Sequence, residues 1–169
     1  MLDGVIIGNL CTLVAMGFNA LSTTRKTTKG VLMTQNAAQA VYAASAIVLG
    51  GYSAAVQNVV SIVRNFVATL KNSNKYVEWT LVILGVVLGI WVNNLGWIGL
   101  LPVVGTLQYT LAIFRFKDDE RKVKISFLIS SVSFVVFNFA IQNYVGVAAD
   151  SFVSITTMIM LLKKSNKKA

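Results

Sequence analysis

Four long stretches of this chain carry almost no charge, and they constrain the fold more than any other feature. Residues 4–24, 30–63 and 79–114 hold no charged side chain, and residues 125–162 hold one, Asp150. About 20 apolar residues are enough for one helix to cross a bilayer. The first stretch therefore fits one membrane-spanning helix, and each of the others is long enough for a hairpin of two.

Each of the three longer stretches is interrupted near its middle by residues that favour a turn, at 50–51, 93–96 and 142–146. Backbone polar groups in lipid must be paired within the structure, and continuous apolar runs without period-two alternation exclude a β-barrel. The sequence therefore predicts an all-α membrane protein. The seven expected transmembrane helices cover residues 4–21, 33–49, 53–70, 76–92, 97–114, 123–141 and 145–162.

The composition agrees with a membrane protein and excludes several kinds of site. Hydrophobic residues make up 56% of the 169 residues and charged residues 12%, whereas soluble domains carry about 25% charged residues. The chain has no His, and Cys11 is its only Cys, so it can form neither an internal disulfide nor a Cys/His zinc site. No nucleophile with a base and no Gly-rich phosphate loop can be assembled. We expect no enzymatic activity, cofactor or metal.

The positive charge is confined to one set of loops. All 15 Lys and Arg residues, which give a net charge of +9, lie after the first, around the end of the third, after the fifth and after the seventh expected helix. Loops rich in Lys and Arg stay in the cytoplasm, so we expect the N-terminus outside and the C-terminus inside. We assign the charge to topology and to anionic lipid headgroups rather than to nucleic acid. The acidic run at residues 118–120 is interpreted as a solvated loop.

Polar positions recur in the two halves of the chain. In the second expected helix Gln35, Gln39 and Tyr42 share one face, and 91 residues later come Ser126, Ser130 and Ser133. In the third, the offset is 93 residues and pairs Gln57, Ser61 and Arg64 with Asp150, Ser154 and Thr157. This predicts two parallel three-helix units, residues 1–75 and 96–169, joined by a linker helix within 76–95, with a site between the units.

Two charged residues inside expected helices are candidates for function. Asp150 is the only acid there, and it either couples transport to a proton or cation or complements the dipole at a helix N-terminus. Arg64 either pairs with an anionic group of a substrate, extends to the cytoplasmic headgroups or forms an ion pair that locks the bundle. We expect the two to lie toward opposite sides of the membrane. A polar row of Asn58, Ser61 and Asn65 adjoins Arg64 and would bind a solute or bond across helices.

Several motifs also resemble a known family. They are the segment 100–106 around Pro102, Gly51-Tyr52 with Arg64 twelve residues on, Asn138-Phe139, Gly146 and Ser151-Phe152. With these the chain resembles the bacterial inner-membrane proteins known as YgjV-like, and through them the wider MtN3/PQ-loop group of SWEET sugar facilitators and the KDEL receptor. The resemblance implies a bacterial inner-membrane location, a 3+1+3 helix arrangement, and substrate contacts from the third helix, at Asn58 or Gln57, and from the seventh, at Asp150.

Two functions remain open. The first is a small transporter or facilitator of a small polar solute, with a pathway lined by Gln57, Asn58, Ser61, Arg64, Asn138 and Asp150. The alternative is a non-transporting receptor or assembly subunit, in which the same polar rows only hold helices together. A cavity between the units would favour the first function, and a dry, packed interface the second. The Gly85 and Gly89 pair suits either an intramolecular neighbour or a homo-oligomer.

Overall fold

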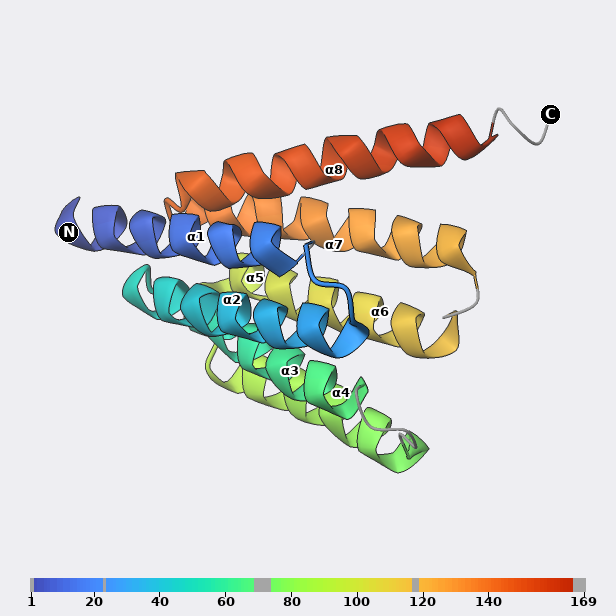
Figure 1. The fold of residues 1–169 in the computed structure, drawn as a ribbon. Coiled ribbons are helices and arrows are strands. Elements are labelled where there is room, and N and C mark those ends of the chain that lie inside the picture. Colours follow the sequence, from blue (N-terminus) through green and yellow to red (C-terminus); the bar gives the residue numbers. More distant parts are fainter. Residues whose placement is uncertain (1, 23, 69–73, 117–118, 166–169) are drawn as a thin grey trace.

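The computed structural model describes residues 2–22, 24–68, 74–116 and 119–165. Within these ranges the chain forms helices and no strand, which confirms the all-α prediction. The helices are α1 (Leu2–Ser22), α2 (Thr28–Val48), α3 (Tyr52–Ala68), α4 (Lys75–Trp91), α5 (Gly96–Gly99), α6 (Leu101–Arg115), α7 (Glu120–Ala140) and α8 (Tyr144–Ser165). They lie side by side in a bundle, with the N-terminus at one end and the C-terminus at the other (Figure 1).

Two contacts between distant segments close the bundle into a ring. Within each half, α1 packs on α2 and α2 on α3, as α6 packs on α7 and α7 on α8. In addition, α1 contacts α8 and α3 contacts α6. The six helices α1, α2, α3, α6, α7 and α8 therefore form a closed ring, and α4 lies outside it against α3 and α6.

The distribution of side chains is that of a protein in lipid. Large apolar residues face outward, among them Leu10 and Ile83 at 57% exposure, whereas Gln57 and Ser53 are fully buried. In the described part of the chain, four segments are long and apolar enough to cross a membrane: α1, residues 96–115 of α5 and α6, residues 121–140 of α7 and residues 144–162 of α8. By contrast, α3 and α4 have only 17 residues each, and α2 is more polar.

Helices α2 and α7 begin earlier than expected because polar side chains cap them. Helix α2 begins at Thr28 rather than at 33, since Thr27 Oγ1 accepts the N–H of Gly30 at 3.1 Å. Helix α7 begins at Glu120 rather than 123, since Asp119 Oδ1 accepts the N–H of Lys122 at 3.1 Å. The hydrogen bond from that N–H, with the Lys122 ammonium, lowers the pKa of Asp119. Interpreting residues 118–120 as a solvated loop was wrong at Glu120, which begins α7, whereas Asp119 precedes the helix and its side chain is 43% exposed; residue 118 lies outside the described residues.

A proline interrupts the fifth expected helix. The prediction of one helix over residues 97–114 is wrong at Leu100, where α5 ends and α6 begins. Pro102 is the second residue of α6, and it has no N–H to donate to a residue one turn earlier. Its ring is fully buried, so the break is packed within the bundle.

The α2–α3 and α7–α8 connections are turns of the same kind at the same end of the bundle. In the first, Gly50 has φ 74° and the N–H of Gly51 donates to the Ala46 carbonyl at 2.7 Å. In the second, Gln142 has φ 60° and the N–H of Asn143 donates to the Asn138 carbonyl at 2.9 Å. Both are Schellman motifs, in which a left-handed residue ends the helix.

Each of these Schellman turns is held by an asparagine from another part of the bundle. Asn9 of α1 donates from Nδ2 to the Gln142 carbonyl at 2.9 Å, and its Oδ1 accepts the N–H of Val145 at 2.9 Å. Asn94, just before α5, donates to the Gly50 carbonyl at 2.8 Å. These hydrogen bonds tie the six-helix ring together at the end where the chain begins.

Candidate functional site

A cavity of about 710 Å³ lies inside the six-helix ring. Its lining residues come from α1, α2, α3, α6, α7 and α8, with none from α4 or α5. Cavities of roughly 300–1,000 Å³ are the size at which proteins hold small molecules. The interface between the two halves of this chain is therefore hollow.

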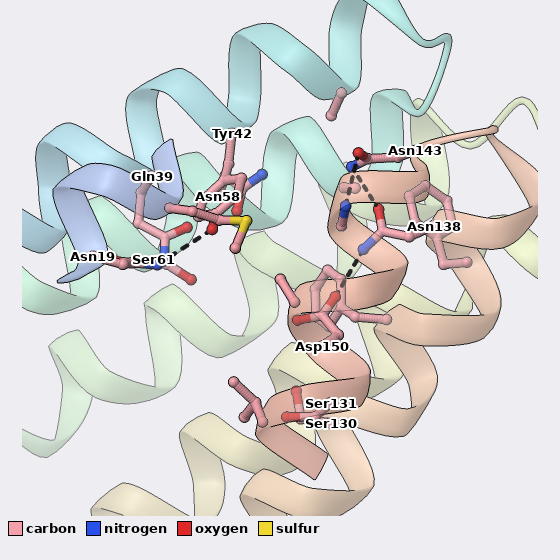
Figure 2. Close-up of a pocket in the computed structure, with 18 of the residues that line it drawn as sticks. Asn19, Gln39, Tyr42, Asn58, Ser61, Ser130, Ser131, Asn138, Asn143 and Asp150 are labelled. Carbon is pink, nitrogen blue, oxygen red and sulfur yellow. Dashed lines mark hydrogen bonds between the residues drawn. The ribbon is translucent and has the colours of Figure 1, made fainter. Parts of the chain in front are cut away.

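The cavity has two chemically different walls. Helices α1 to α3 provide a polar wall of Asn19, Gln39, Tyr42, Asn58 and Ser61, whose side chains gather on one side in Figure 2. Within it, Asn19 Nδ2 donates to Tyr42 Oη at 3.4 Å. Helices α7 and α8 provide the second wall, in which the rings of Phe127, Phe134, Phe137 and Phe152, called the phenyl wall below, accompany the polar side chains of Ser130, Ser131, Asn138 and Asp150. A solute in this space would meet amides and hydroxyls on both sides and phenyl rings on the second.

Asp150 is held at the cavity by a chain of asparagines. Asn138 Nδ2 donates to Asp150 Oδ2 at 2.8 Å, and Asn143 Nδ2 donates to Asn138 Oδ1 at 3.0 Å (Figure 2). Asn143 Oδ1 in turn accepts the N–H of Gly146 at 3.1 Å, which caps the first turn of α8. The α7–α8 turn thus fixes the position of the carboxylate, and Asp150 lies in the second turn of α8 rather than the first.

Arg64 reaches the cavity from α3 and bridges to α6. Its Nη1 donates to Thr110 Oγ1 at 3.4 Å, and its Nη2 donates to Asn65 Oδ1 at 3.3 Å. The guanidinium carbon lies 5.7 Å from the centre of the Tyr109 ring, within reach of a cation–π interaction. Asn65 is itself fixed by Asn36, whose Oδ1 accepts from Asn65 Nδ2 at 2.9 Å. Arg64 therefore lies inside the bundle, among hydroxyl, amide and aromatic groups.

The structure gathers five of the six candidate residues around this cavity: Asn58, Ser61, Arg64, Asn138 and Asp150. The exception is Gln57, which is 2% exposed and donates from Nε2 to the Gly85 carbonyl of α4 at 2.8 Å. Gln57 therefore attaches α4 to the ring and does not line the cavity. The Gly85 and Gly89 pair faces this intramolecular neighbour, because a Cβ built at Gly89 would lie 2.5 Å from Gln57 Nε2.

Several lining residues were not among the candidates. Asn143 lies in a segment that the sequence analysis interpreted only as a turn between two helices. Asn19 lies in the first expected helix, in which no site residue was predicted. The phenyl wall was not predicted, because nine Phe residues are spread through an apolar chain and do not stand out. Its spacing of Phe127, Phe134 and Phe137 does place the three on one helical face, and this is the signal that could have found them.

The cavity reaches the protein surface between α1 and α8. Its exposed lining residues are Ala20 of α1 and Ala148 and Phe152 of α8, with Phe152 69% exposed. At the end where the chain begins, Asn9 joins the same two helices by its hydrogen bonds to the α7–α8 turn. The α1–α8 seam is therefore closed at that end and open farther along. Within the described ranges, no three Asp, Glu, His or Cys side chains gather to hold a metal ion.

Residues 6–168 match the model of one protein family, Imp-YgjV, described as a bacterial inner membrane protein. The chain belongs to this family. The match covers nearly the whole chain, including all the residues that line the cavity, and it confirms the resemblance to the YgjV-like proteins and the inner-membrane location expected from the sequence. No curated protein and no solved structure matches this member of the YgjV family.

Proposed function

We propose that this protein is a small inner-membrane transporter or facilitator, without enzymatic activity, that carries a small polar solute through the cavity. One observation carries the proposal: the space between the two halves is a cavity lined by Asn58, Ser61, Arg64, Asn138 and Asp150. In the alternative function the polar side chains only join helices, and they would then be packed against one another with no cavity between them. The hollow interface therefore favours transport.

The contacts in the ring support two three-helix units related by a pseudo-two-fold axis. If α1, α2 and α3 are exchanged with α6, α7 and α8, the α1–α8 contact becomes the α6–α3 contact, and both are present. Helix α4 lies outside the ring, as expected of a linker between units at residues 1–75 and 96–169. We propose that these contacts reflect the 3+1+3 arrangement of the MtN3/PQ-loop group, to which we extend the resemblance. Transporters with parallel repeats place their substrate between the repeats.

The two Schellman turns supply the alignment of the repeat. Gly50 and Gln142 are the left-handed residues, 92 positions apart. The same offset pairs Asn58 with Asp150 and Ala54 with Gly146. All four of these residues line the cavity. The 93-residue offset expected for α3 and α8 had placed Gln57 opposite Asp150, and the turns favour Asn58 in its place.

We assign the end of the bundle that holds the N-terminus to the outside, with seven membrane crossings in which residues 96–115 count as one. The described bases outside Arg64 support this, since Arg25, Lys26, Lys75, Arg115 and Arg121 are at or near the opposite end. Loops with Lys and Arg face the cytoplasm, where they meet anionic headgroups.

The first experiment is a thermal-shift screen of the purified protein against small polar solutes, followed by uptake of each stabilising solute into proteoliposomes. Two variants on the same helix provide the decisive comparison. Ser131 lines the cavity, whereas Ser133 does not and bonds to the Ile129 carbonyl at 2.9 Å. We expect Ser131→Leu to reduce uptake at least tenfold and Ser133→Leu to leave it within about twofold. Equal uptake by both variants, or no uptake of any stabilising solute, would favour the receptor alternative.

A further inference from the structure

The cavity is lined by one basic and one acidic side chain that do not pair with each other. Arg64 of α3 and Asp150 of α8 both line it. The structure gives one ion pair among the residues it describes, Lys122 with Asp119, and neither cavity charge takes part in it. An ion inside a membrane protein is costly unless a partner or water meets it. Two such ions facing one cavity point to a ligand that carries both complementary charges.

Both groups keep unused hydrogen-bonding capacity toward the cavity. The Arg64 guanidinium has about five N–H donors, and its two side-chain hydrogen bonds, at 3.3 and 3.4 Å, are long. On Asp150 the one side-chain donor is Asn138, which occupies Oδ2. Asn138 and Asn143 hold this carboxylate in place. The site is therefore built to present one anionic and one cationic group to a ligand.

The two charges are separated along the bundle. Helices α3 and α8 both begin at the end that holds the N-terminus, Arg64 being 12 residues from Tyr52 and Asp150 being 6 from Tyr144. The difference of six residues corresponds to about 9 Å along a helix. Two extended residues cover about 7 Å, and a hydrogen bond of about 3 Å at each end brings the reach of such a ligand to about 13 Å. This covers the offset along the bundle and leaves length for an offset across the cavity. Four Phe side chains line the same cavity as the two charged groups.

We propose that the cavity binds an elongated zwitterion with an apolar middle, whose anionic group meets Arg64, whose cationic group meets Asp150, and whose body packs on the phenyl wall. This inference rests on the proposed function, because the ligand is a transport substrate only if the protein is a transporter. Its binding can nevertheless be measured without transport. We expect the source to be a water-soluble zwitterion of dipeptide length. A zwitterionic lipid headgroup, which could enter where Phe152 is exposed, also carries one charge of each sign but holds them closer together, and the test distinguishes the two.

The test is equilibrium binding to the purified full-length protein in detergent. The probes are phenylalanylalanine, its N-acetyl derivative and its C-terminal amide, which remove one charge each. We expect the free dipeptide to bind at least tenfold more tightly than either blocked form, because each blocked form leaves one cavity charge unmatched. Dihexanoylphosphatidylethanolamine and dihexanoylphosphatidylglycerol form the lipid arm. Preference for the first lipid, with no binding of the dipeptide, assigns the zwitterion to a headgroup.

Variants show which residue meets which charge. In Asp150→Asn the free and N-acetylated dipeptides should bind with equal affinity while the amide is still rejected, and in Arg64→Gln the converse should hold. Asp3→Asn and Arg25→Gln change exposed charges outside the cavity and should keep the wild-type ranking. One of the two cavity variants could fail to fold. The affinities of the wild-type protein for the three dipeptides, together with those of the other variant, then test whether the cavity binds both charges of the ligand.

Equal binding of all probes, binding of none, or blocked forms that bind as well as the free dipeptide would overturn the inference. These results leave the proposed function standing if a cavity variant still changes uptake of another solute. Tight zwitterion binding without any uptake would instead support the inference and refute transport, so the two failures are distinguishable.

Discussion

The α2–α3 and α7–α8 hairpins share one backbone plan and differ in the groups they present. Both end their first helix in a Schellman turn with the same pair of backbone hydrogen bonds, and both turns are held by an asparagine from elsewhere. Yet the first hairpin lines the cavity with Gln39, Tyr42 and Asn58, and the second with phenyl rings and a carboxylate. The same turn geometry therefore accommodates linings of different chemistry.

The difference is sharpest at the turns themselves. In the first hairpin, Gly51 packs so closely on Phe137 that a Cβ added there would lie 2.8 Å from the ring. In the second hairpin, Asn143 occupies the corresponding position and starts the hydrogen-bonded chain to Asp150. One turn therefore serves packing between the hairpins, and the other positions a charge.

The largest expected effect concerns the side of the membrane on which both turns lie. In a protein without Cys11, the variants Tyr52→Cys and Tyr144→Cys should react with an impermeant maleimide in intact spheroplasts. Both side chains are exposed, and both lie at the end of the bundle that we assign to the outside. Cysteines at Thr28 and Asn166 should react only after permeabilisation. Labelling of Tyr52→Cys and Tyr144→Cys from opposite sides would break the equivalence of the two hairpins.

The second prediction concerns Asp150, whose counterpart in the first hairpin is the neutral Asn58. If the carboxylate couples transport to a proton or cation, Asp150→Asn should abolish accumulation of a substrate against its gradient and preserve exchange, because asparagine keeps the size of the side chain but cannot ionise. If it only complements the dipole of α8, the change should cost about 0.3–1 kcal/mol of stability and leave accumulation normal. The measurement is uptake in energised and de-energised vesicles.

The double variant Asn58→Asp/Asp150→Asn sharpens this result. It moves the acid to the corresponding position of the other hairpin, and restored accumulation would show that the two positions are interchangeable. Loss of accumulation in this variant would indicate that Asn138, which bonds to Asp150, is part of the requirement.

A third prediction addresses the hydrogen-bonded chain of the second hairpin. Asn138 is 8% exposed and bonds to both Asn143 and Asp150. Asn138→Ala leaves two buried polar groups without this partner and should lower the free energy of unfolding by about 1–3 kcal/mol. The corresponding residue of the first hairpin, 92 positions before Asn138, is Ala46. Ala46→Gly serves as the control and should lower the free energy of unfolding by about 1 kcal/mol. Thermal unfolding in detergent measures both, and an Asn138→Ala effect no larger than the control would show that the chain contributes little.

The helices of this fold could be predicted from the sequence, whereas much of the site could not. Long uncharged stretches report burial in lipid directly, so six of the seven expected helices are present within a few residues of their predicted bounds, and the fifth is divided at Leu100. The errors at Thr28 and Glu120 arose because caps extend helices into charged segments. Helical spacing shows which residues share a face of a helix, but not whether that face packs on α4 or lines a cavity. This is why Gln57 was predicted to line the pathway together with Asn58. Asn143 was missed because a turn residue acquires its role only when the turn is folded.

The fourth prediction compares the two asparagines that hold the turns. Asn9 makes two hydrogen bonds to the α7–α8 connection, and Asn94 makes one to the α2–α3 turn. At about 0.5–1.5 kcal/mol for each hydrogen bond, Asn9→Ala should destabilise the protein roughly twice as much as Asn94→Ala. Denaturant unfolding gives both values. Equal losses would mean that the Asn9 bonds are replaced by water, as expected if the α1–α8 seam opens at this end.

The smallest effect tests the left-handed residue at each turn. Gln142 has φ 60°, a conformation that costs a residue with a Cβ about 1 kcal/mol and glycine nothing comparable. Gln142→Gly removes this cost and retains the backbone carbonyl that accepts from Asn9, so it should raise the free energy of unfolding by about 0.5–1 kcal/mol. At Gly50 a Cβ would meet nothing within 4 Å, so Gly50→Gln should lower the free energy of unfolding by a similar amount through conformation alone.

Thermal unfolding of the two single variants and of the variant that combines both substitutions measures these effects, with shifts in melting temperature of about 1–4 °C expected. In the combined variant the two effects should cancel if the turns are equivalent. A net loss of stability would show instead that the Gln142 side chain contributes to the second turn beyond its backbone.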